Sequence, residues 1–244
     1  MPRMRLDKFL KDMGIAGRAE IKQYIKSGRV TVDGACVTAA ETHIDPDSSI
    51  VCFDGERVGY VPYRYFMLDK PEGVLTATED RRQKTVFDLL TDEQKRLELF
   101  PVGRLDKDTS GLLLLTNDGE FAHTVISPKS EIKKQYYAEV EGIPNEIDAK
   151  AFKDGIVLAD GTHCLPAELE PLGDNHCLVT VMEGKYHQVK RMLASRGKNV
   201  VKLRRLSIGQ LQIDESLGAG GIKELGEEDL CKVFNGVPWQ KRTK

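Results

Sequence analysis

The chain has 244 residues, of which 40% are hydrophobic, and this is enough to bury one large core or a small and a medium one. It contains no run of 18 apolar residues and no apolar stretch behind its N-terminal charges, so we expect neither a membrane span nor a secretory signal, and a cytoplasmic location. The net charge of −2 excludes a generally polycationic protein.

Basic residues nevertheless concentrate in two segments of the chain. Residues 1–29 contain eight basic and three acidic residues, and residues 185–205 contain eight basic residues and no acid. Two such segments in a mildly acidic chain indicate surfaces that bind a polyanion, although a solvated helix face would give the same pattern in either segment alone.

Five scattered cysteines without a Cys-x-x-Cys pair argue against a disulfide framework and against zinc knuckles. The pairs His163-Cys164 and His176-Cys177 are the sequence's one hint of a metal site. Because neighbouring residues of a strand point to opposite faces, we interpret these pairs as ordinary strand residues and predict no metal site.

Residues 1–60 are predicted to form a first domain of two helices and a hairpin. Apolar residues spaced along one helix face predict helices over 6–13 and 18–27. Alternating valines predict a strand at 30–32, a turn at Asp33-Gly34 and a return strand from Val37, and a further strand is expected over 50–53.

The stretch MRLDKFLKDMGIAGRAEIKQYIKSGRVTVDGACV resembles the αL RNA-binding motif, a module shared by a small-subunit ribosomal protein and many RNA-modifying enzymes. The resemblance covers residues 4–55 and implies that the helix pair presents basic side chains to structured RNA. Such a surface reads phosphate and shape, since double-stranded RNA hides its base edges in a deep narrow groove. The RNA-binding candidates are Arg5, Lys8, Arg18, Lys22, Lys26 and Arg29.

A polar joint over 56–63 is predicted to lead into a second domain over 64–240. Strands are expected over 65–68, 112–115, 133–141 and 200–208 and near Ile156, Ala167 and Leu178, and helices over 86–90, 146–153 and 186–195. Many strands joined by turns and hairpins, with few helices, predict an α+β fold with a mainly antiparallel sheet.

The stretch GRLDKDTSGLLLLTNDG places charged residues directly before four leucines. The leucines lack polar alternation, so both faces of that strand should be buried, and a turn at Asn117-Asp118-Gly119 is expected to end it. The loop before the strand is held on a rigid element. A carboxylate in this loop, Asp106, needs a cation to stay ionised beside a low-dielectric core, and Arg104, Lys190 or Arg191 can supply it. The alternative is a loop-stapling ion-pair network of Arg104, Asp106 and Asp108.

Two further stretches carry groups that suit a nucleotide. In KKQYYAEV, Lys134 and Tyr136 share one strand face, so that the cation can meet phosphate while the ring stacks on a base. Taken alone, a Lys-x-Tyr strand is more often a plain solvent face. In EGKYHQVKRML, a glycine turn opens a helix whose exposed side carries His187, Lys190 and Arg191. Taken alone, His187 would be interpreted as a hydrogen-bonded residue at the start of a helix.

Together and in this order, the three stretches resemble the pseudouridine synthases, most closely their RsuA-type subfamily, which acts on small-subunit ribosomal RNA. The resemblance covers residues 65–230, and the N-terminal module fits the same subfamily. It implies that Asp106 is the catalytic residue, that Tyr136 packs against the target base and that Lys190 forms an ion pair with Asp106. Arg104 is expected to contact RNA and to help extrude the base.

The resemblance also fixes the expected chemistry and partners. Isomerising uridine breaks its N-glycosidic bond, rotates the uracil and rejoins it through carbon, so the base must leave its stack and stay enclosed. Neither a redox step nor a phosphoryl donor takes part, and no cofactor is therefore expected. The expected partner is ribosomal RNA, with 16S RNA preferred, free or in small-subunit assembly intermediates, and the protein is expected to be a monomer without a membrane partner. Further substrate-binding candidates are Lys134, His187 and Arg191.

Three other functions stay open from the residues. A large-subunit ribosomal RNA pseudouridine synthase would carry the same catalytic stretches, although the short C-terminal tail favours the small-subunit type. A non-catalytic ribosome-assembly protein would use the two basic segments alone. A metal-dependent nuclease would need Asp106, Asp108 and Asp118 around a metal ion.

Overall fold

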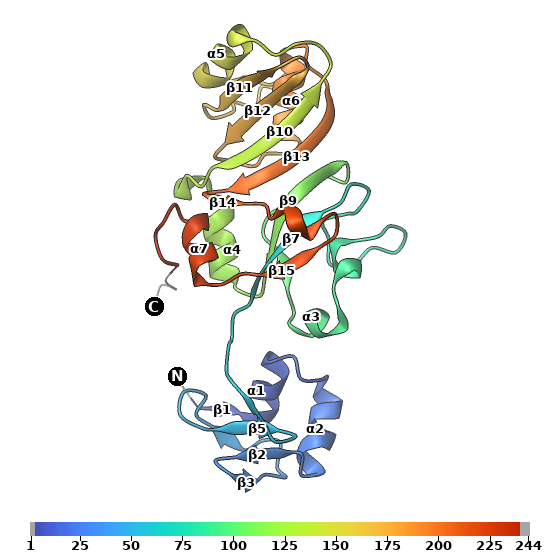
Figure 1. Ribbon diagram of the computed structural model, residues 1–244, viewed down its shortest axis with the longest axis vertical. Helices are drawn as coiled ribbons and strands as arrows, with labels where there is room; N and C mark the ends of the chain where they lie inside the picture. Colours follow the sequence, from blue (N-terminus) through green and yellow to red (C-terminus); the bar gives the residue numbers. More distant parts are fainter. Residues whose placement is uncertain (1–2, 240–244) are drawn as a thin grey trace. The chain divides into compact units, whose positions relative to one another are not determined.

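The protein is described by a computed structural model that covers residues 3–239. The chain divides into two compact units, an N-terminal unit of residues 1–64 and 90–99 and a C-terminal unit of residues 65–89 and 100–244. Figure 1 shows the helices and strands of each unit. Within the described residues, no helix is both long and apolar enough to cross a membrane.

The N-terminal unit packs short helices against small antiparallel sheets, one pairing β1 with β4 and one in the order β3-β2-β5-β6. Its elements are β1 (Met4–Arg5), α1 (Leu6–Asp12), α2 (Arg18–Lys26), β2 (Val30–Val32), β3 (Ala35–Cys36), β4 (His43–Ile44), β5 (Val51–Phe53), β6 (Glu56–Val58) and α3 (Asp92–Arg96). The apolar faces of α1 and α2 are buried at Leu6, Phe9, Leu10, Ile21 and Ile25, as the helical spacing predicted.

Tight two-residue turns shorten the predicted connections in this unit. Asp33 and Gly34 both have positive φ, of 51° and 80°, so the return strand begins at Ala35 rather than at Val37. Asp54-Gly55 makes the same kind of turn, with φ of 50° and 86°. Residues 56–58, predicted to belong to a polar joint, therefore pair with β5 as a strand.

The segment 90–99 belongs to the N-terminal unit, which the sequence pattern did not indicate. Thr91 begins α3 with a capping box, in which its side chain accepts from Gln94 N and the Gln94 side chain accepts from Thr91 N. Glu98 forms an ion pair with Lys11, with 2.6 Å between Oε1 and Nζ. Two buried leucines on either side of Glu98 add apolar contact.

The C-terminal unit is built on one nine-stranded sheet in the order β11-β12-β10-β13-β9-β7-β15, with β14 beside β13 and β8 beside β9. The predicted α+β fold with a mainly antiparallel sheet is confirmed, because β9 and β13 form its single parallel pair within residues 3–239. Its elements are β7 (Tyr65–Lys70), η1 (Val86–Leu89), β8 (Phe100–Pro101), β9 (Thr109–Thr116), α4 (Gly119–Ile126), η2 (Pro128–Ser130), β10 (Lys134–Val140), α5 (Glu146–Asp154), β11 (Glu168–Gly173), β12 (His176–Val181), α6 (Gln188–Ser195), β13 (Val200–Ile208), β14 (Leu211–Gln212), η3 (Glu215–Leu217), β15 (Ile222–Glu224) and α7 (Glu227–Val233).

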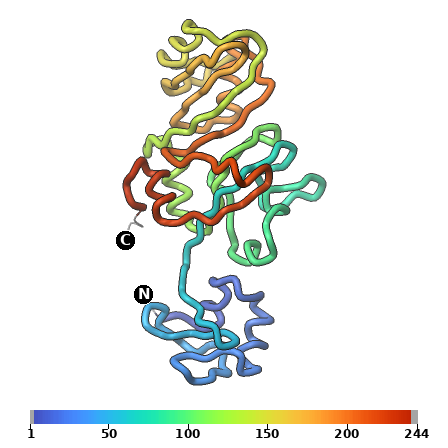
Figure 2. The backbone as a smooth tube through the Cα atoms, in the orientation of Figure 1, coloured from blue at the N-terminus to red at the C-terminus, as the bar shows by residue number. Residues whose placement is uncertain are grey.

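Two hydrophobic cores lie along this sheet and meet where β9 pairs with β13. One core joins β10 and β12 to α5 and α6, and the other joins β7 and β9 to α4 and α7. The four leucines of β9 are at most 1% exposed, which confirms that both faces of this strand are buried. Figure 2 shows β9 and β13, far apart in sequence, side by side in this unit. We call this contact the seam.

Gly111 lies at the seam, paired with Arg205, and has a φ of +100°. A Cβ atom on Gly111 would lie 2.3 Å from the backbone oxygen of Arg205. Both the backbone conformation and the close approach of β13 therefore require glycine here.

The structure corrects three local predictions in this unit. The turn at 117–119 instead begins α4, because the Asp118 side chain accepts hydrogen bonds from the first backbone N–H groups of that helix. Near Ile156 there is an isolated bridge between Val157 and His163 rather than a strand. The helix predicted over 186–195 begins at Gln188, because His187 has a left-handed backbone conformation with φ 48°.

Candidate active site

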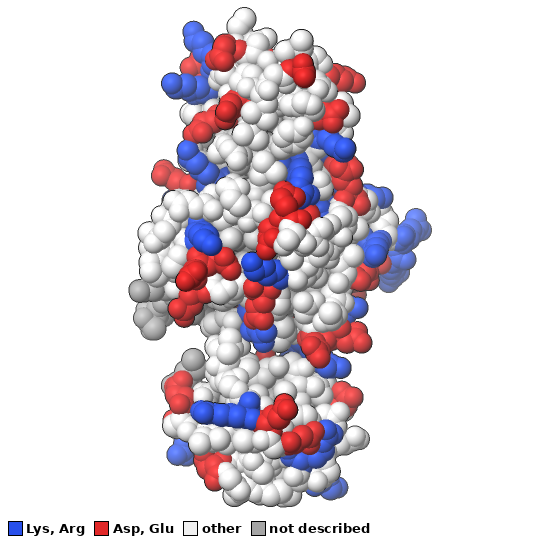
Figure 3. Space-filling model, in the orientation of Figure 1, with Lys and Arg blue, Asp and Glu red and all other residues white. Residues whose placement is uncertain are grey.

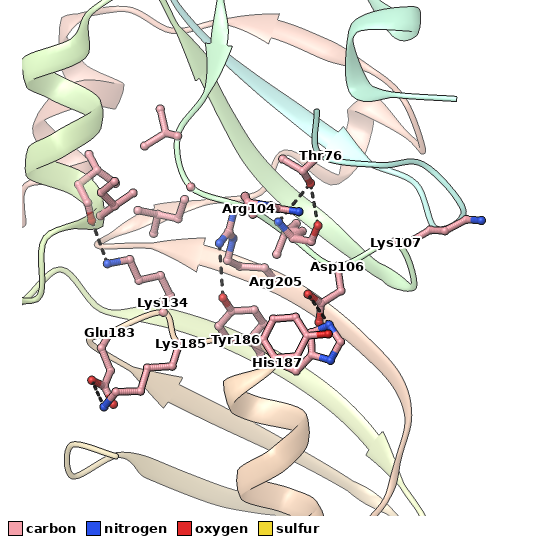
Figure 4. Close-up of a pocket in the computed structure, with 18 of the residues that line it drawn as sticks. Thr76, Arg104, Asp106, Lys107, Lys134, Glu183, Lys185, Tyr186, His187 and Arg205 are labelled. Atoms are coloured by element: carbon pink, nitrogen blue, oxygen red, sulfur yellow. Dashed lines mark hydrogen bonds and ion pairs between the residues drawn. The ribbon is translucent and has the colours of Figure 1, made fainter. Parts of the chain in front are cut away.

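A cavity of about 780 Å³ opens at the seam, a size common for small-ligand sites (Figure 4). Its walls come from the loop before β9, from β10 and β13, and from the turn before α6. The polar and aromatic side chains in these walls include Arg104, Asp106, Lys134, Tyr136, His187 and Arg205.

The loop that carries Asp106 is fixed by two buried side chains that the sequence analysis did not single out. Lys70 is 0% exposed, and its ammonium donates to the backbone oxygens of Pro71, Asp106 and Thr109 at 2.9 to 3.0 Å. The hydroxyl of Thr76 donates to the Leu105 oxygen at 2.7 Å and accepts from the Leu105 N–H at 3.2 Å. The backbone around Asp106 is therefore satisfied by protein groups and held in one conformation.

Asp106 lies between two basic side chains. One carboxylate oxygen is 3.4 Å from Nε2 of His187, and the other is 3.4 Å from Nζ of Lys190. The Asp106 side chain is 28% exposed, so it can be reached from the cavity. Lys190 also bonds Asp108, and this hydrogen bond lowers the pKa of the Asp108 carboxyl. The structure thus brings together the carboxylate and the cation that the motifs predicted to meet.

Tyr136 and Lys134 both line the cavity from β10, as expected for residues two apart on a strand. The Lys134 ammonium, however, donates to the backbone oxygen of Val125 at 2.9 Å, in the last turn of α4 (Figure 4). Burial, with a smaller contribution from Arg205, lowers the pKa of Lys134 to about 8. Lys134 was expected to meet phosphate on an open strand face; its partner is instead the negative end of a helix.

Arg205 lines the cavity, although the sequence motifs predicted no role for it. It is 5% exposed, its Nε donates to the Leu112 oxygen at 2.7 Å, and its guanidinium lies 5.9 Å from the centre of the Tyr136 ring. A guanidinium nitrogen also lies 3.4 Å from the Tyr136 hydroxyl. Arg205 therefore orients the ring of Tyr136 from the seam.

Acidic side chains from other parts of the fold offset most of the positive charge of the basic segment 185–205. Six of its eight cations form ion pairs with acids from outside the segment, and Arg205 is buried. Arg191 is one of the six: it pairs with Asp160 and does not line the cavity. On the face shown in Figure 3, basic and acidic side chains are intermingled. The segment therefore carries less unpaired positive charge than its sequence suggested.

In the N-terminal unit, four of the six predicted RNA-binding residues line one depression of about 490 Å³. They are Arg5, Lys8, Arg18 and Lys22. Lys26 is exposed on α2 outside this depression. Arg29 lies over the rings of Tyr24 and Phe53, at 4.2 and 4.7 Å, and pairs with Asp54, contacts that stabilise the unit itself.

The structure separates the three aspartates that a metal-dependent nuclease would need. Asp118 begins α4 and is 1% exposed, with its carboxylate accepting from the Tyr65 hydroxyl at 2.8 Å. Strand β9, of eight residues, lies between Asp118 and Asp108 and spans roughly 25 Å at the usual rise per residue. Asp118 therefore cannot share a metal ion with Asp106 and Asp108.

A cavity of this size, a carboxylate beside a lysine, and an aromatic ring contacted by an arginine suit an enzyme that acts on one nucleotide extruded from RNA. Comparison with known proteins defines the class further. Residues 64–195 match the RNA pseudouridylate synthase family, and residues 4–50 match the S4 domain.

Relatives match over nearly the full length of the chain. An uncharacterized RNA pseudouridine synthase of Bacillus subtilis, YtzG, is 45% identical over 231 residues, which cover 93% of this chain and 97% of that protein. The ribosomal small subunit pseudouridine synthase A of Vibrio cholerae is 41% identical over 233 residues, which cover 95% and 100%. A crystal structure of a pseudouridylate synthase superposes with a TM-score of 0.67 at 34% identity and covers 94% of this chain and 99% of that one. The chain belongs to the RNA pseudouridylate synthase family.

Proposed function

We propose that this protein converts a specific uridine of small-subunit ribosomal RNA into pseudouridine, with Asp106 as the essential carboxylate. The observation that carries the proposal is the position of Asp106 in the cavity wall, 3.4 Å from the ammonium of Lys190. The small-subunit substrate is supported by relatives named ribosomal small subunit pseudouridine synthase A, at 38 to 41% identity. A large-subunit substrate has no comparable support.

Four side chains in and beside the cavity have roles in this reaction. The extruded uracil stacks on Tyr136, which returns about 1 to 3 kcal/mol of the unstacking free energy. Asp106 acts as nucleophile on the sugar or the base, or as base toward the sugar, and Lys190 offsets its charge. Arg104, exposed at the cavity rim, contacts the RNA from which the base has left. Domain 1–60 holds the RNA, and domain 64–240 carries out the reaction in the cytoplasm, on free RNA or on an assembling particle.

Mapping pseudouridine in ribosomal RNA from cells with and without this gene tests the proposal. We expect one site in 16S RNA to disappear in the deletion strain and to return when the wild-type gene is restored. Loss of a site in large-subunit RNA would move the substrate assignment, and no loss at all would contradict the function.

Removal of two cations tests whether the N-terminal depression binds the RNA backbone. Changing both Arg18 and Lys22 to alanine should reduce the slope of log K against log salt by about 1 to 2, one unit or less for each lost phosphate contact. kcat at saturating RNA should not change. Arg57→Ala, an exposed arginine of β6 outside the depression, is the matched control and should leave the slope as it is.

Alkaline pH should inactivate the enzyme through Lys70. Burial lowers the pKa of Lys70 to about 8, against the opposing charges of Asp106 and Asp108. Below that pH the ammonium makes charge-assisted hydrogen bonds to the loop of Asp106, and above it these bonds weaken. We therefore expect kcat to fall as pH rises through about 8. Lys134 has a similar pKa, so the profile is measured in Lys134→Met as well. A flat profile in that variant would assign the decline to Lys134 instead.

A further inference from the structure

We propose that Tyr186 holds a second nucleobase of the RNA, a neighbour of the target uridine, stacked on its ring at the edge of the cavity. This inference rests on the proposed function, since it assumes an RNA substrate. It adds a nucleobase subsite beside the pocket for the extruded uridine.

The first observation is the exposure of the Tyr186 ring. Tyr186 lines the cavity and yet is 75% exposed, more than any other large apolar side chain among residues 3–239. Exposed apolar residues are common singly, but an aromatic ring on the rim of a ligand cavity is placed where a ligand can cover it. Tyrosine suits a wet rim because its ring stacks while its hydroxyl stays in water.

The second observation is the orientation of the ring. Tyr186 is stacked on His187, with 3.9 Å between ring centres and 17° between ring planes. His187 is in turn 3.4 Å from the carboxylate of Asp106. Figure 4 shows the two rings overlapping beside Asp106. A base on the other face of Tyr186 would continue this stack, two layers from the reacting carboxylate.

The third observation is that several hydrogen bonds, centred on a buried glutamate, hold the turn that carries the ring. Glu183 is 6% exposed and accepts hydrogen bonds from Leu165 N–H, from the side chain of Gln188 and from the ammonium of Lys185, at 2.7 to 2.9 Å. The Gln188 side chain also accepts from Lys185 N–H at 2.9 Å. A ring held on such a turn loses little conformational entropy when a base stacks on it.

A positioning role is the competing explanation. If Tyr186 served only to hold His187 beside Asp106, the ring would act on the chemical step and not on the RNA. Loss of stacking with a base weakens binding in the ground state and the transition state alike, so KM rises while kcat is kept. Loss of a positioning contact lowers kcat instead.

Kinetics of three variants separate these roles. For Tyr186→Ala, we expect KM for the RNA to rise about 5- to 150-fold, the range for one stacked base, with kcat little changed. Tyr186→Phe keeps the ring and should behave like wild type. Ile147→Ala, on α5 and 71% exposed, is the control for loss of an equally exposed apolar side chain and should change neither constant. A fall in kcat without a rise in KM would overturn the proposal.

Fluorescence of 2-aminopurine locates the base without relying on turnover. The probe replaces each neighbour of the mapped uridine in turn, in complexes with Asp106→Asn protein to prevent reaction. We expect quenching by stacking at one position and its loss when Tyr186→Ala is added. Equal quenching with and without the ring would refute the subsite. If the wild-type protein forms no pseudouridine in ribosomal RNA, the proposed function fails, and quenching of a short oligouridine carrying one 2-aminopurine still decides whether Tyr186 stacks on a base.

Discussion

Asp106→Asn should abolish pseudouridine formation, lowering kcat by more than about 10⁴-fold, while the protein still binds its RNA. The amide keeps the size of the carboxylate but can act neither as nucleophile nor as base. Folding should be unaffected, because Lys70 and Thr76 hold this loop through backbone groups. The measurement is single-turnover pseudouridine formation together with RNA affinity.

Asp108→Asn is the matched control for this change. The Asp108 side chain is 76% exposed and shares Lys190 with Asp106, so its loss should lower kcat by less than about tenfold. The pair also tests the ribosome-assembly alternative, since a protein that only binds would keep its cellular function with Asp106→Asn. Equal losses in the two variants would contradict the central role of Asp106.

Gly111→Ala should have the largest effect on stability, lowering the free energy of unfolding of the C-terminal unit by more than about 4 kcal/mol. The new Cβ would overlap the backbone of β13, and alanine is also strained at this φ. Trp239, the chain's single tryptophan, stacks on Phe234 in this unit, with 4.9 Å between ring centres. Its fluorescence therefore follows unfolding of this unit alone.

Gly119→Ala provides the comparison. Gly119 is the first residue of α4, and nothing lies within 4 Å of the Cβ it lacks. This variant should unfold within about 1 kcal/mol of wild type. If Gly111→Ala proved as stable as Gly119→Ala, the close pairing of β9 with β13 would be contradicted.

Sequence patterns predicted those helices and strands whose own residues show helical or strand spacing of apolar side chains. Helices α1 and α2, the buried strand β9 and the long strand β13 follow from apolar spacing alone, and β13 was predicted with the same ends as observed. Helix α4 was missed because Asn117-Asp118-Gly119 is equally typical of a turn. Only its hydrogen bonds show Asp118 to be a helix cap.

The sequence predicted those residues of the candidate site that belong to recognisable motifs. Asp106 and Tyr136 line the cavity, and Lys190 lies beside Asp106, as the resemblance implied. Lys70 and Arg205 were not found, because the backbone oxygens of Asp106 and Leu112 to which they donate lie 36 and 93 positions away in the sequence. The charge of segment 185–205 was misjudged for the same reason, since the acids that pair with it come from other parts of the chain.

The seam keeps the reacting groups close to one another. β9 and β13 pair through three residue pairs, and within residues 3–239 this is the only strand pairing between the two halves of the sheet. The carboxylate enters from one half, whereas the lysine and the tyrosine enter from the other. Local opening of this pairing would move the carboxylate away from the lysine and the tyrosine before the rest of the unit unfolds, so activity should report on this junction more sensitively than global melting does.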